Sequence, residues 1–268
     1  IHQLKLDIIH TQTEFSLGFL GKLISTTFGI PMVHTYHTMY EDYVHYIAGG
    51  HLISAEGARE FSRIFCNTAM AVIAPTQKTE RLLLSYGVNK PISIIPTGID
   101  TSHFRKSNYD PAEILELRHS LGLKADTPVL ISIGRIAKEK SIDVLVEFFA
   151  AHFRGDDAYK LFIIGDGPEK ENLERQIVRL GVGAQVRLLG RIEHQFLPPY
   201  YHACDLFTTA SLSEMNSISM LEAMASGLYV IQRLDIYNKN QITPGENGNV
   251  FNTAEEMAAL LREEAALT

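Results

Sequence analysis

Short apolar runs alternate with longer amphipathic stretches along almost the whole chain. Glycine and proline punctuate the alternation, for example at Gly29, Gly87 and Pro111. Strands that alternate with helices build parallel sheets covered by helices on their faces, so the pattern predicts an α/β protein. In the first half we expect strands at 6–10, 31–36, 71–75 and 92–96, and helices at 15–29, 54–69 and 77–87.

A second series begins after a connecting stretch near residues 100–125. We expect its helices at 110–123, 141–153, 168–181, 216–227 and 253–265, and its strands at 128–134, 160–165, 185–190, 205–210 and 229–232. Two such series predict two Rossmann-like domains facing a cleft, one over residues 1–109 and one over 110–268. A full doubly wound domain has about six strands. The shorter first series therefore predicts a truncated N-terminal domain, and Ile1 in place of methionine suggests that the natural start has been removed.

The composition is that of an ordinary globular protein. Of 268 residues 46% are hydrophobic and 21% are charged, which suits two domains. Cys66 and Cys204 are the cysteines, so no disulfide framework is implied and a reducing cytosol is expected. No apolar run approaches the roughly 20 residues that span a bilayer, and no signal peptide opens the sequence.

Charge divides the chain unevenly. Residues 1–125 carry 11 basic and 11 acidic side chains, whereas residues 126–268 carry 13 and 20, which accounts for the whole net charge of −7. Eight of the eleven histidines lie in the first half. An acidic second half argues against nucleic acid as a partner.

Glu214 and Glu222 lie on either side of a predicted strand-to-helix junction, where open α/β sheets bind ligands. A carboxylate accepts two hydrogen bonds and suits vicinal hydroxyls of a sugar or ribose. The helix start between them, Asn216 to Ser219, would offer backbone N–H groups to an anion. Taken alone, the two acids are equally compatible with an ordinary solvated helix.

The loop GRIAKEK, residues 134–140, places Arg135 and Lys140 after a predicted buried strand. A planar guanidinium and a compact ammonium together suit a diphosphate, although two solvated loop cations would look the same. The Gly-x-Gly of IGDGPEKENL, residues 164–173, lacks a third glycine at dinucleotide spacing. We interpret it as a tight turn with Pro168 opening a helix.

Together these features resemble the retaining GT-B glycosyltransferases of family 4. GRIAKEKS, IGDGPE, Glu214-x7-Glu222 with its second acid within LEAMASGLYVI, and IPTGIDTSHF at 95–104 stand in that family's order and approximate spacing. The stretches DIIHTQTEFSLGFLGK and HTYHTMYEDYVHYI look most like the bacterial branch that glycosylates diacylglycerol lipids. The resemblance covers nearly the whole chain.

The resemblance implies that the second domain binds a UDP-sugar donor and that the first domain faces the acceptor. Arg135 and Lys140 match the diphosphate-binding pair, and Glu222 matches the acid on the ribose hydroxyls. Glu214 and His37 match residues near the donor sugar, and Asn216, Ser217 and Ile218 occupy the helix start that faces the donor. No Asp-x-Asp motif is present, so the resemblance implies no metal and no cofactor beyond the donor.

HTYHTMYEDYVHY, residues 34–46, could be a metal site, an acid/base cluster or a wall around a polar ligand. His34-x2-His37 lacks other well-spaced zinc ligands, so we interpret the stretch as a cleft wall in which His37 meets the donor sugar. His34 and His45 are expected to be structural, as are Tyr36, Tyr40 and Tyr43.

The family usually has Glu-Gly-Phe-Gly where this chain has Glu214-Met215-Asn216-Ser217. The family's N-terminal Gly-rich loop and its C-terminal crossing helix are not found here.

The expected function is metal-independent, retaining transfer of a hexose from a UDP-sugar to diacylglycerol or monoglycosyl-diacylglycerol. We expect the protein to be cytoplasmic, with peripheral membrane contact. Two alternatives remain open: a non-catalytic homologue that binds a partner transferase, and a transferase with a cell-wall polymer or protein-linked glycan as acceptor.

Overall fold

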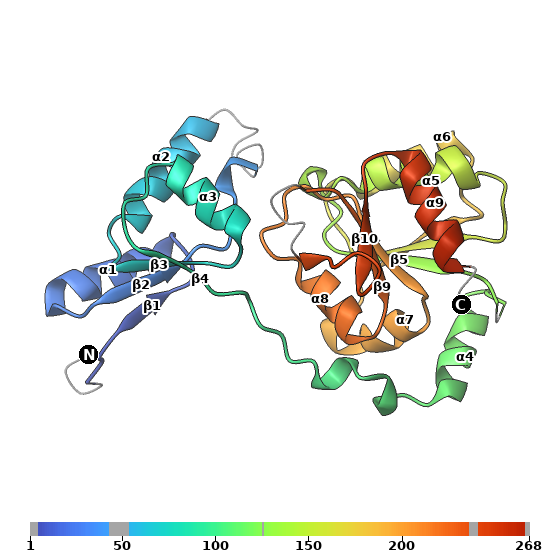
Figure 1. The fold of residues 1–268 in the computed structure, drawn as a ribbon, viewed down its shortest axis with the longest axis horizontal. Coiled ribbons are helices and arrows are strands. Elements are labelled where there is room, and N and C mark those ends of the chain that lie inside the picture. The colour runs from blue at the N-terminus through green and yellow to red at the C-terminus, as the bar shows by residue number, and fades with distance from the viewer. Residues whose placement is uncertain (1–4, 43–53, 125, 236–240, 266–268) are drawn as a thin grey trace. The chain divides into compact units, whose positions relative to one another are not determined.

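The computed structural model describes residues 5–42, 54–124, 126–235 and 241–265 (Figure 1). The chain forms two compact units, which are described separately. Unit 1 comprises Ile1–Gly98 with Ser213–Asn216, and unit 2 comprises Ile99–Leu212 with Ser217–Thr268. The first change of unit falls between Gly98 and Ile99, whereas the sequence analysis placed the boundary between residues 109 and 110.

In unit 1 the described residues form a four-stranded parallel sheet in the order β1-β2-β3-β4. Each strand pairs with the next one along the chain, so right-handed crossovers place the connecting helices on one face of the sheet. The elements are β1 (Ile9–Thr11), α1 (Ser16–Phe28), β2 (Met32–Thr35), α2 (Ala55–Cys66), β3 (Ala71–Ala74), α3 (Gln77–Ser85) and β4 (Ile92–Ile94).

Local sequence explains where these helices begin, end and pack. Ser54 and Thr76 accept hydrogen bonds from Gly57 N and Thr79 N, so they cap α2 and α3. Gly29 ends α1 in the left-handed conformation. At Gly18 a Cβ would lie 1.9 Å from Thr13 O, so glycine lets α1 lie close to the preceding loop.

In unit 2 the described residues form a six-stranded parallel sheet in the order β10-β9-β8-β5-β6-β7. The strand order reverses between β5 and β8, which makes this the switch point of a doubly wound sheet. The elements are α4 (Pro111–Ser120), β5 (Val129–Ile133), α5 (Ile142–Phe153), β6 (Lys160–Ile164), α6 (Lys170–Leu180), β7 (Val186–Gly190), α7 (Pro198–His202), β8 (Leu206–Thr209), α8 (Ile218–Ala225), β9 (Tyr229–Arg233), β10 (Gly248–Phe251) and α9 (Ala254–Ala265).

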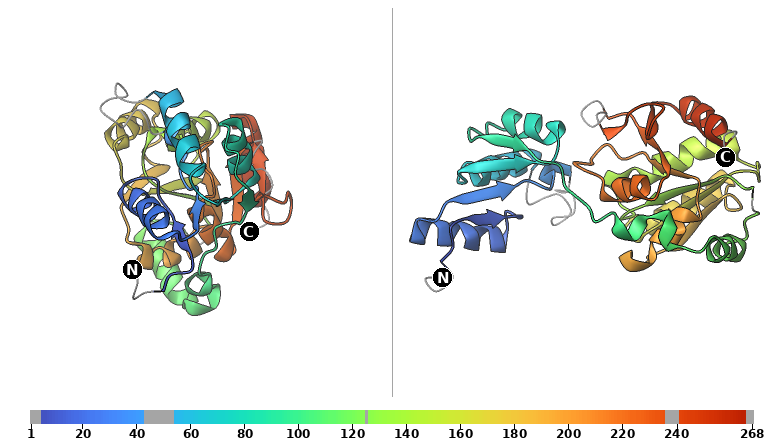
Figure 2. Two further views of the ribbon diagram at one scale, coloured as in Figure 1. Left: turned by 90° about the vertical axis from the view of Figure 1, so that its left-hand side faces the viewer. Right: turned by 60° about the horizontal axis from the view of Figure 1, so that its bottom comes forward.

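Helices cover both faces of this second sheet, with α5 and α9 side by side on one face and α7 and α8 on the other (Figures 1 and 2). One buried cluster lies under α5, α6 and α9 and includes Leu145, Phe149 and Leu261. The other lies under α7 and α8 and includes Tyr201 and Met220. Both faces of β5 are therefore buried, which explains its continuous run of apolar residues.

Both cysteines are free and buried, one in each unit. Burial raises the pKa of the Cys66 thiol to about 12, and it raises the pKa of Cys204 as well.

Two elements of unit 2 differ from the sequence-based expectation. The helix α7 was not predicted; it begins at the Pro198-Pro199 pair, because the first turn of a helix tolerates proline. The strand β10 begins at Gly248 within a glycine- and asparagine-rich stretch that lacks the usual strand pattern. Its pairing with β9 is a tertiary effect that local sequence does not encode.

Hydrogen bonds join the loops after β5, β6 and β7 at the carboxyl edge of the sheet. Gly134 N donates to Ile164 O at 3.0 Å, and Gly165 N donates to Gly190 O at 2.9 Å. A Cβ at Gly165 would lie 1.8 Å from Gly134 O, and one at Gly167 would lie 2.3 Å from Ile136 O. The Gly-x-Gly thus permits two loops to touch. The turn was expected, but α6 begins at Lys170 rather than at Pro168.

Gly165→Ala is expected to lower the free energy of unfolding of unit 2 by about 3 kcal/mol or more, because it combines a φ of +148° with a backbone clash. Calorimetric unfolding measures the loss. Gly183→Ala is the matched control, since nothing lies within 4 Å of its added Cβ. Equal melting temperatures for the two variants would contradict the close-packing account.

Candidate active site

The switch point of unit 2 brings the loop after β5 next to the loop after β8. Ser211 Oγ donates a hydrogen bond to Glu139 O at 3.2 Å across this junction. In doubly wound sheets ligands bind outside the carboxyl ends of the strands at such a point. The candidate site is therefore built from the segments that follow β5, β6, β7 and β8.

A pocket of about 480 Å³ lies at this edge of the sheet. Glycine residues make up part of its wall, so backbone rather than side chains faces the space. Isoleucine and leucine side chains supply an apolar surface, and charged side chains lie beside it. The lining residues are Ile133, Gly134, Arg135, Ile164, Gly165, Asp166, Gly167, Arg191, Ile192 and Leu197.

The two cations predicted from the sequence lie on the segment that follows β5. Arg135 is exposed and lines the pocket, while Lys140 is half-buried at the end of a 3₁₀ turn, Lys138–Lys140. Ser141 follows with φ of 49° and ψ of 38°, a left-handed conformation that is uncommon outside glycine. Such strain persists where the surrounding fold fixes the backbone.

Arg191 is a pocket residue that the sequence analysis missed. It is exposed and lines the same pocket as Arg135. The sequence contains a signal that could have found it, because both β5 and β7 run into the tripeptide Gly-Arg-Ile, at 134–136 and 190–192. Parallel strands in one sheet end at the same edge, so identical tripeptides after β5 and β7 place two guanidinium groups around one pocket.

Glu222 lies on α8 with only 4% of its surface exposed. Its carboxylate has two protein partners, Tyr201 OH at 2.9 Å and His194 Nε2 at 2.6 Å. Burial and the nearby carboxylate raise the pKa of Tyr201, so this hydroxyl remains a donor. The acid that the sequence assigned to a ribose thus belongs to a hydrogen-bonded group of three side chains within unit 2.

The start of α8 differs in part from the expectation. Ser217 occupies the N-cap position, but its side chain makes no capping hydrogen bond and lies 3.3 Å from Ser219 Oγ. Ile218 is exposed as the first helical residue. The helix start thus lies within Asn216 to Ser219, as expected, and its N-cap position has no capping bond from the serine side chain.

Glu214, Met215 and Asn216 group with unit 1, whereas Glu222 belongs to unit 2. Glu214 is half-buried, and Asn216 Nδ2 donates to Thr97 O at 3.4 Å. Met215 is 6% exposed. The bulk that this methionine adds, relative to glycine in the family pattern, is therefore buried.

His37 lies in unit 1 just after β2, where it is exposed. Its Nε2 donates to Gln12 Oε1 at 2.6 Å, which fixes the tautomer and leaves Nδ1 as an acceptor. Burial of the ring and then the neighbouring His34 lower the pKa of His37. A neutral imidazole can accept a hydrogen bond from a hydroxyl group. Sequence reasoning did not identify Gln12 as its partner.

A buried group of polar side chains lies near His37 in unit 1. His34 is fully buried, with Glu14 Oε1 3.0 Å from Nε2 and Thr11 Oγ1 2.9 Å from Nδ1. Tyr40 OH donates to Glu14 Oε2. His34 and Tyr40 are therefore structural, as expected, and so is Tyr36, which is fully buried and bonded to Ser62 Oγ. Tyr43 and His45 lie outside the described residues.

Within the described residues no group of three or more histidine, cysteine or acidic side chains is arranged to hold a metal ion. None of the described helices combines the length and hydrophobicity needed to span a bilayer.

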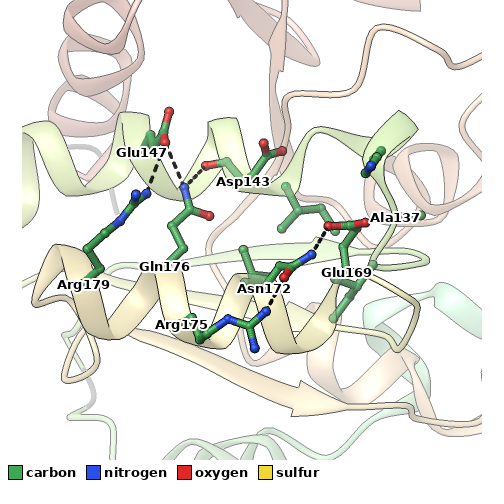
Figure 3. Close-up of a pocket in the computed structure, with 12 residues that line it drawn as sticks. Ala137, Asp143, Glu147, Glu169, Asn172, Arg175, Gln176 and Arg179 are labelled. Carbon is green, nitrogen blue, oxygen red and sulfur yellow. Dashed lines mark hydrogen bonds and ion pairs between the residues drawn. The ribbon is translucent and has the colours of Figure 1, made fainter.

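A larger groove of about 620 Å³ lies between α5 and α6 in unit 2 (Figure 3). Side chains of the two helices interact across it, since Gln176 Nε2 on α6 donates to Asp143 O and Glu147 Oε1 on α5. Asn172 Nδ2 donates to Glu169 Oε2 within the start of α6. None of the site residues predicted from the sequence lines this groove. The groove shares the loop after β5 with the predicted site, because Ile136, Ala137 and Lys138 line it.

We expect His37 to titrate below the ordinary histidine value of 6.5, because burial of the ring disfavours the imidazolium. Between the two values the unfolded chain binds more protons than the folded one, so this residue's contribution to stability falls as pH drops. NMR titration of the His37 ring measures this pKa. A value at or above 6.5 would contradict the assigned environment.

Two family models match the chain. Residues 113–264 match Glycosyl transferases group 1, and residues 1–103 match Glycosyltransferase Family 4. The first match covers more than half of the chain. The chain therefore belongs to the group 1 glycosyltransferases, with two parallel-sheet units of the GT-B kind.

Within this class the chain is similar to alpha-monoglucosyldiacylglycerol synthases. It is 38% identical to the protein of Streptococcus pneumoniae over 261 residues, and 34% identical to that of Acholeplasma laidlawii over 262 residues. These alignments cover 97% and 96% of this chain, but 59% and 66% of the two relatives. The chain thus spans about three fifths to two thirds of the length of the relatives it matches.

Solved structures agree on the fold. Anabaena Alr3699/HepE in complex with UDP superposes with a TM-score of 0.79 at 23% identity, covering 97% of this chain and 69% of that one. Sucrose-phosphate synthase from Thermosynechococcus elongatus superposes with a TM-score of 0.80 at 24% identity, covering 99% of this chain and 66% of that one. The GT-B fold expected from the sequence is confirmed.

Proposed function

We propose that this protein transfers a hexose from a UDP-sugar to a glycerolipid, diacylglycerol or monoglycosyl-diacylglycerol, with retention of configuration and without a metal. The observation that carries the proposal is the identity of 38% and 34% to two alpha-monoglucosyldiacylglycerol synthases over nearly the whole chain. The pocket at the carboxyl ends of β5, β6 and β7 in unit 2 supports the donor half of this assignment.

We assign the nucleotide to unit 2. The apolar side chains of Ile192 and Leu197, beside a wall of glycine backbone, suit the flat face of a nucleobase. Glu222 suits a ribose diol, because a carboxylate can accept two hydroxyl hydrogen bonds. The solved complexes of Anabaena Alr3699/HepE with UDP and with UDP-glucose support a uridine donor for the fold.

The diphosphate would lie against the cations of unit 2 and the start of α8. As the anomeric C–O bond breaks, negative charge develops on the departing UDP. Arg135 and Lys140 would stabilise that charge, with Arg191 as a further cation at the pocket. Backbone N–H groups of Asn216, Ser217 and Ile218, at the junction with α8, would add partial positive charge.

The donor sugar would be oriented by two residues that group with unit 1. His37 is held by Gln12 as a neutral ring with an acceptor nitrogen, which suits a sugar hydroxyl. Glu214 would accept hydrogen bonds from other hydroxyl groups. Neither residue needs to attack the anomeric carbon, since retention would follow from attack by the acceptor hydroxyl on the face that UDP leaves.

Arg135→Ala and Lys140→Ala are each expected to slow sugar transfer by about 10²-fold, as the loss of one transition-state donor typically does. The loss should appear in kcat, because the charge that these groups stabilise develops only in the transition state. Steady-state kinetics with a UDP-sugar measures it. Arg175→Ala is the matched control, since this exposed cation bonds to Asn172 on α6. Rates equal to that control would refute the leaving-group role.

The acceptor is tested by incubating the protein with UDP-glucose or UDP-galactose and diacylglycerol or monoglycosyl-diacylglycerol in mixed micelles. Labelled sugar is expected in the lipid phase, with the α-anomeric configuration, and in the presence of EDTA. Transfer to a cell-wall polymer or glycan, with none to any glycerolipid, would discard the lipid acceptor and leave the transferase assignment intact.

We propose peripheral contact with the membrane that holds the acceptor. The helix α1 supports this, because large apolar side chains are exposed along it. Leu17 and Leu23 are 70% and 63% exposed, and Phe19 and Leu20 are 54% and 50% exposed. Such a surface can insert into the boundary of a lipid layer, where each buried apolar side chain adds to binding.

A non-catalytic homologue that binds a partner transferase is the second candidate. It is favoured by Met215, Asn216 and Ser217, which stand where the family pattern has glycines that allow close approach to the donor. Calorimetry with UDP separates the two candidates, because a protein that no longer handles the donor would show no binding.

A further inference from the structure

Glu222 is bonded in this structure to two side chains that differ greatly in exposure. Tyr201 is fully buried and donates from within the core between α7 and α8. The His194 side chain is 71% exposed, and it donates to Glu222 Oε1 from the solvent side. The Glu222 side chain is 5% exposed. Packing thus fixes the Tyr201 donor, whereas the His194 donor can move away from the carboxylate by rotation of its exposed side chain.

The placement of His194 is supported by neighbouring elements of unit 2. It lies in the 3₁₀ turn His194–Phe196 after β7, in the segment that also supplies Arg191, Ile192 and Leu197 to the pocket. Its ring meets Phe104 edge-on at 5.9 Å between centroids, and Phe104 also contacts Tyr201 at 5.9 Å. The imidazole therefore lies next to the candidate nucleotide pocket and over the buried acid.

The geometry leaves little other access to the carboxylate. Tyr201 OH approaches Oε2 and also lies 3.1 Å from Ser219 O, so the inner side of the acid is filled by protein. A ligand hydroxyl must therefore meet Glu222 on the side where His194 Nε2 lies at 2.6 Å. The ligand hydroxyl and the His194 N–H group cannot both donate along that direction to the same oxygen of Glu222.

We propose that His194 is a positioning residue of the ribose subsite, which holds the Glu222 carboxylate in the nucleotide-free protein and yields its place to a ribose hydroxyl. The inference rests on the proposed uridine nucleotide donor. His194 keeps a buried acid hydrogen-bonded while the site is empty, which avoids the cost of an unpaired buried charge. The exchange replaces one N–H donor by one O–H donor, so the acid remains satisfied throughout.

The test is calorimetric titration of the protein with UDP, comparing wild type, His194→Ala and His119→Ala. His119 is an exposed histidine on α4 and serves as the matched control. His194→Ala should bind UDP about 2- to 5-fold more tightly than wild type, as expected when an exposed hydrogen-bonded side chain no longer competes. His119→Ala should bind UDP as wild type does.

A second ligand separates competition at the ribose from a general effect of the substitution. With 2′,3′-dideoxy-UDP, which lacks both hydroxyls, His194→Ala and wild type should bind equally. Weaker UDP binding by His194→Ala, or an equal gain with the dideoxy nucleotide, would overturn the proposal. If the wild-type protein bound no UDP, the proposed donor would fail, and the role of His194 with it. Normal wild-type binding with equal affinity in His194→Ala would overturn only the role of His194.

Discussion

The carboxyl edge of the second sheet depends on direct contact between backbone segments. The loops after β5, β6 and β7 hydrogen-bond to one another through Gly134, Gly165 and Gly190. Side chains at Gly165 or Gly167 would separate these loops, because their Cβ atoms would overlap carbonyl oxygens of the neighbouring segment. A rigid edge of this kind can hold Arg135 and Arg191 around one pocket without help from side-chain packing. Preorganised charge is what a departing diphosphate requires.

The second unit shows how a reversal of strand order creates a site. Because β8 returns to the far side of β5, the helices α5 and α8 that follow these two strands lie on opposite faces of the sheet, while the loops after the strands meet through Ser211 and Glu139. Glu222 enters this region from α8, and its partners come from α7 and from the turn after β7. Residues separated by up to 28 positions are thus joined at a single carboxylate.

Much of this architecture could be predicted from sequence because periodicity, glycine stops and caps are local signals. The helices around Ser54, Thr76 and Gly29 follow that rule. The strand β10 could not be predicted, because its residues become a strand only by pairing with β9. The site shows the same division. Arg135 and Glu222 were found from motifs, whereas the partners Gln12, Tyr201 and His194 depend on tertiary contacts between distant segments.

The distribution of thiols has a practical consequence. Cys66 and Cys204 lie in different units, and burial keeps both in the unreactive protonated form at neutral pH. Alkylation of either one must therefore wait for local or global opening of its own unit. Labelling rates resolved by mass spectrometry would report the opening free energies of the two units independently. A ligand held by unit 2 alone would slow modification of Cys204 and leave that of Cys66 unchanged.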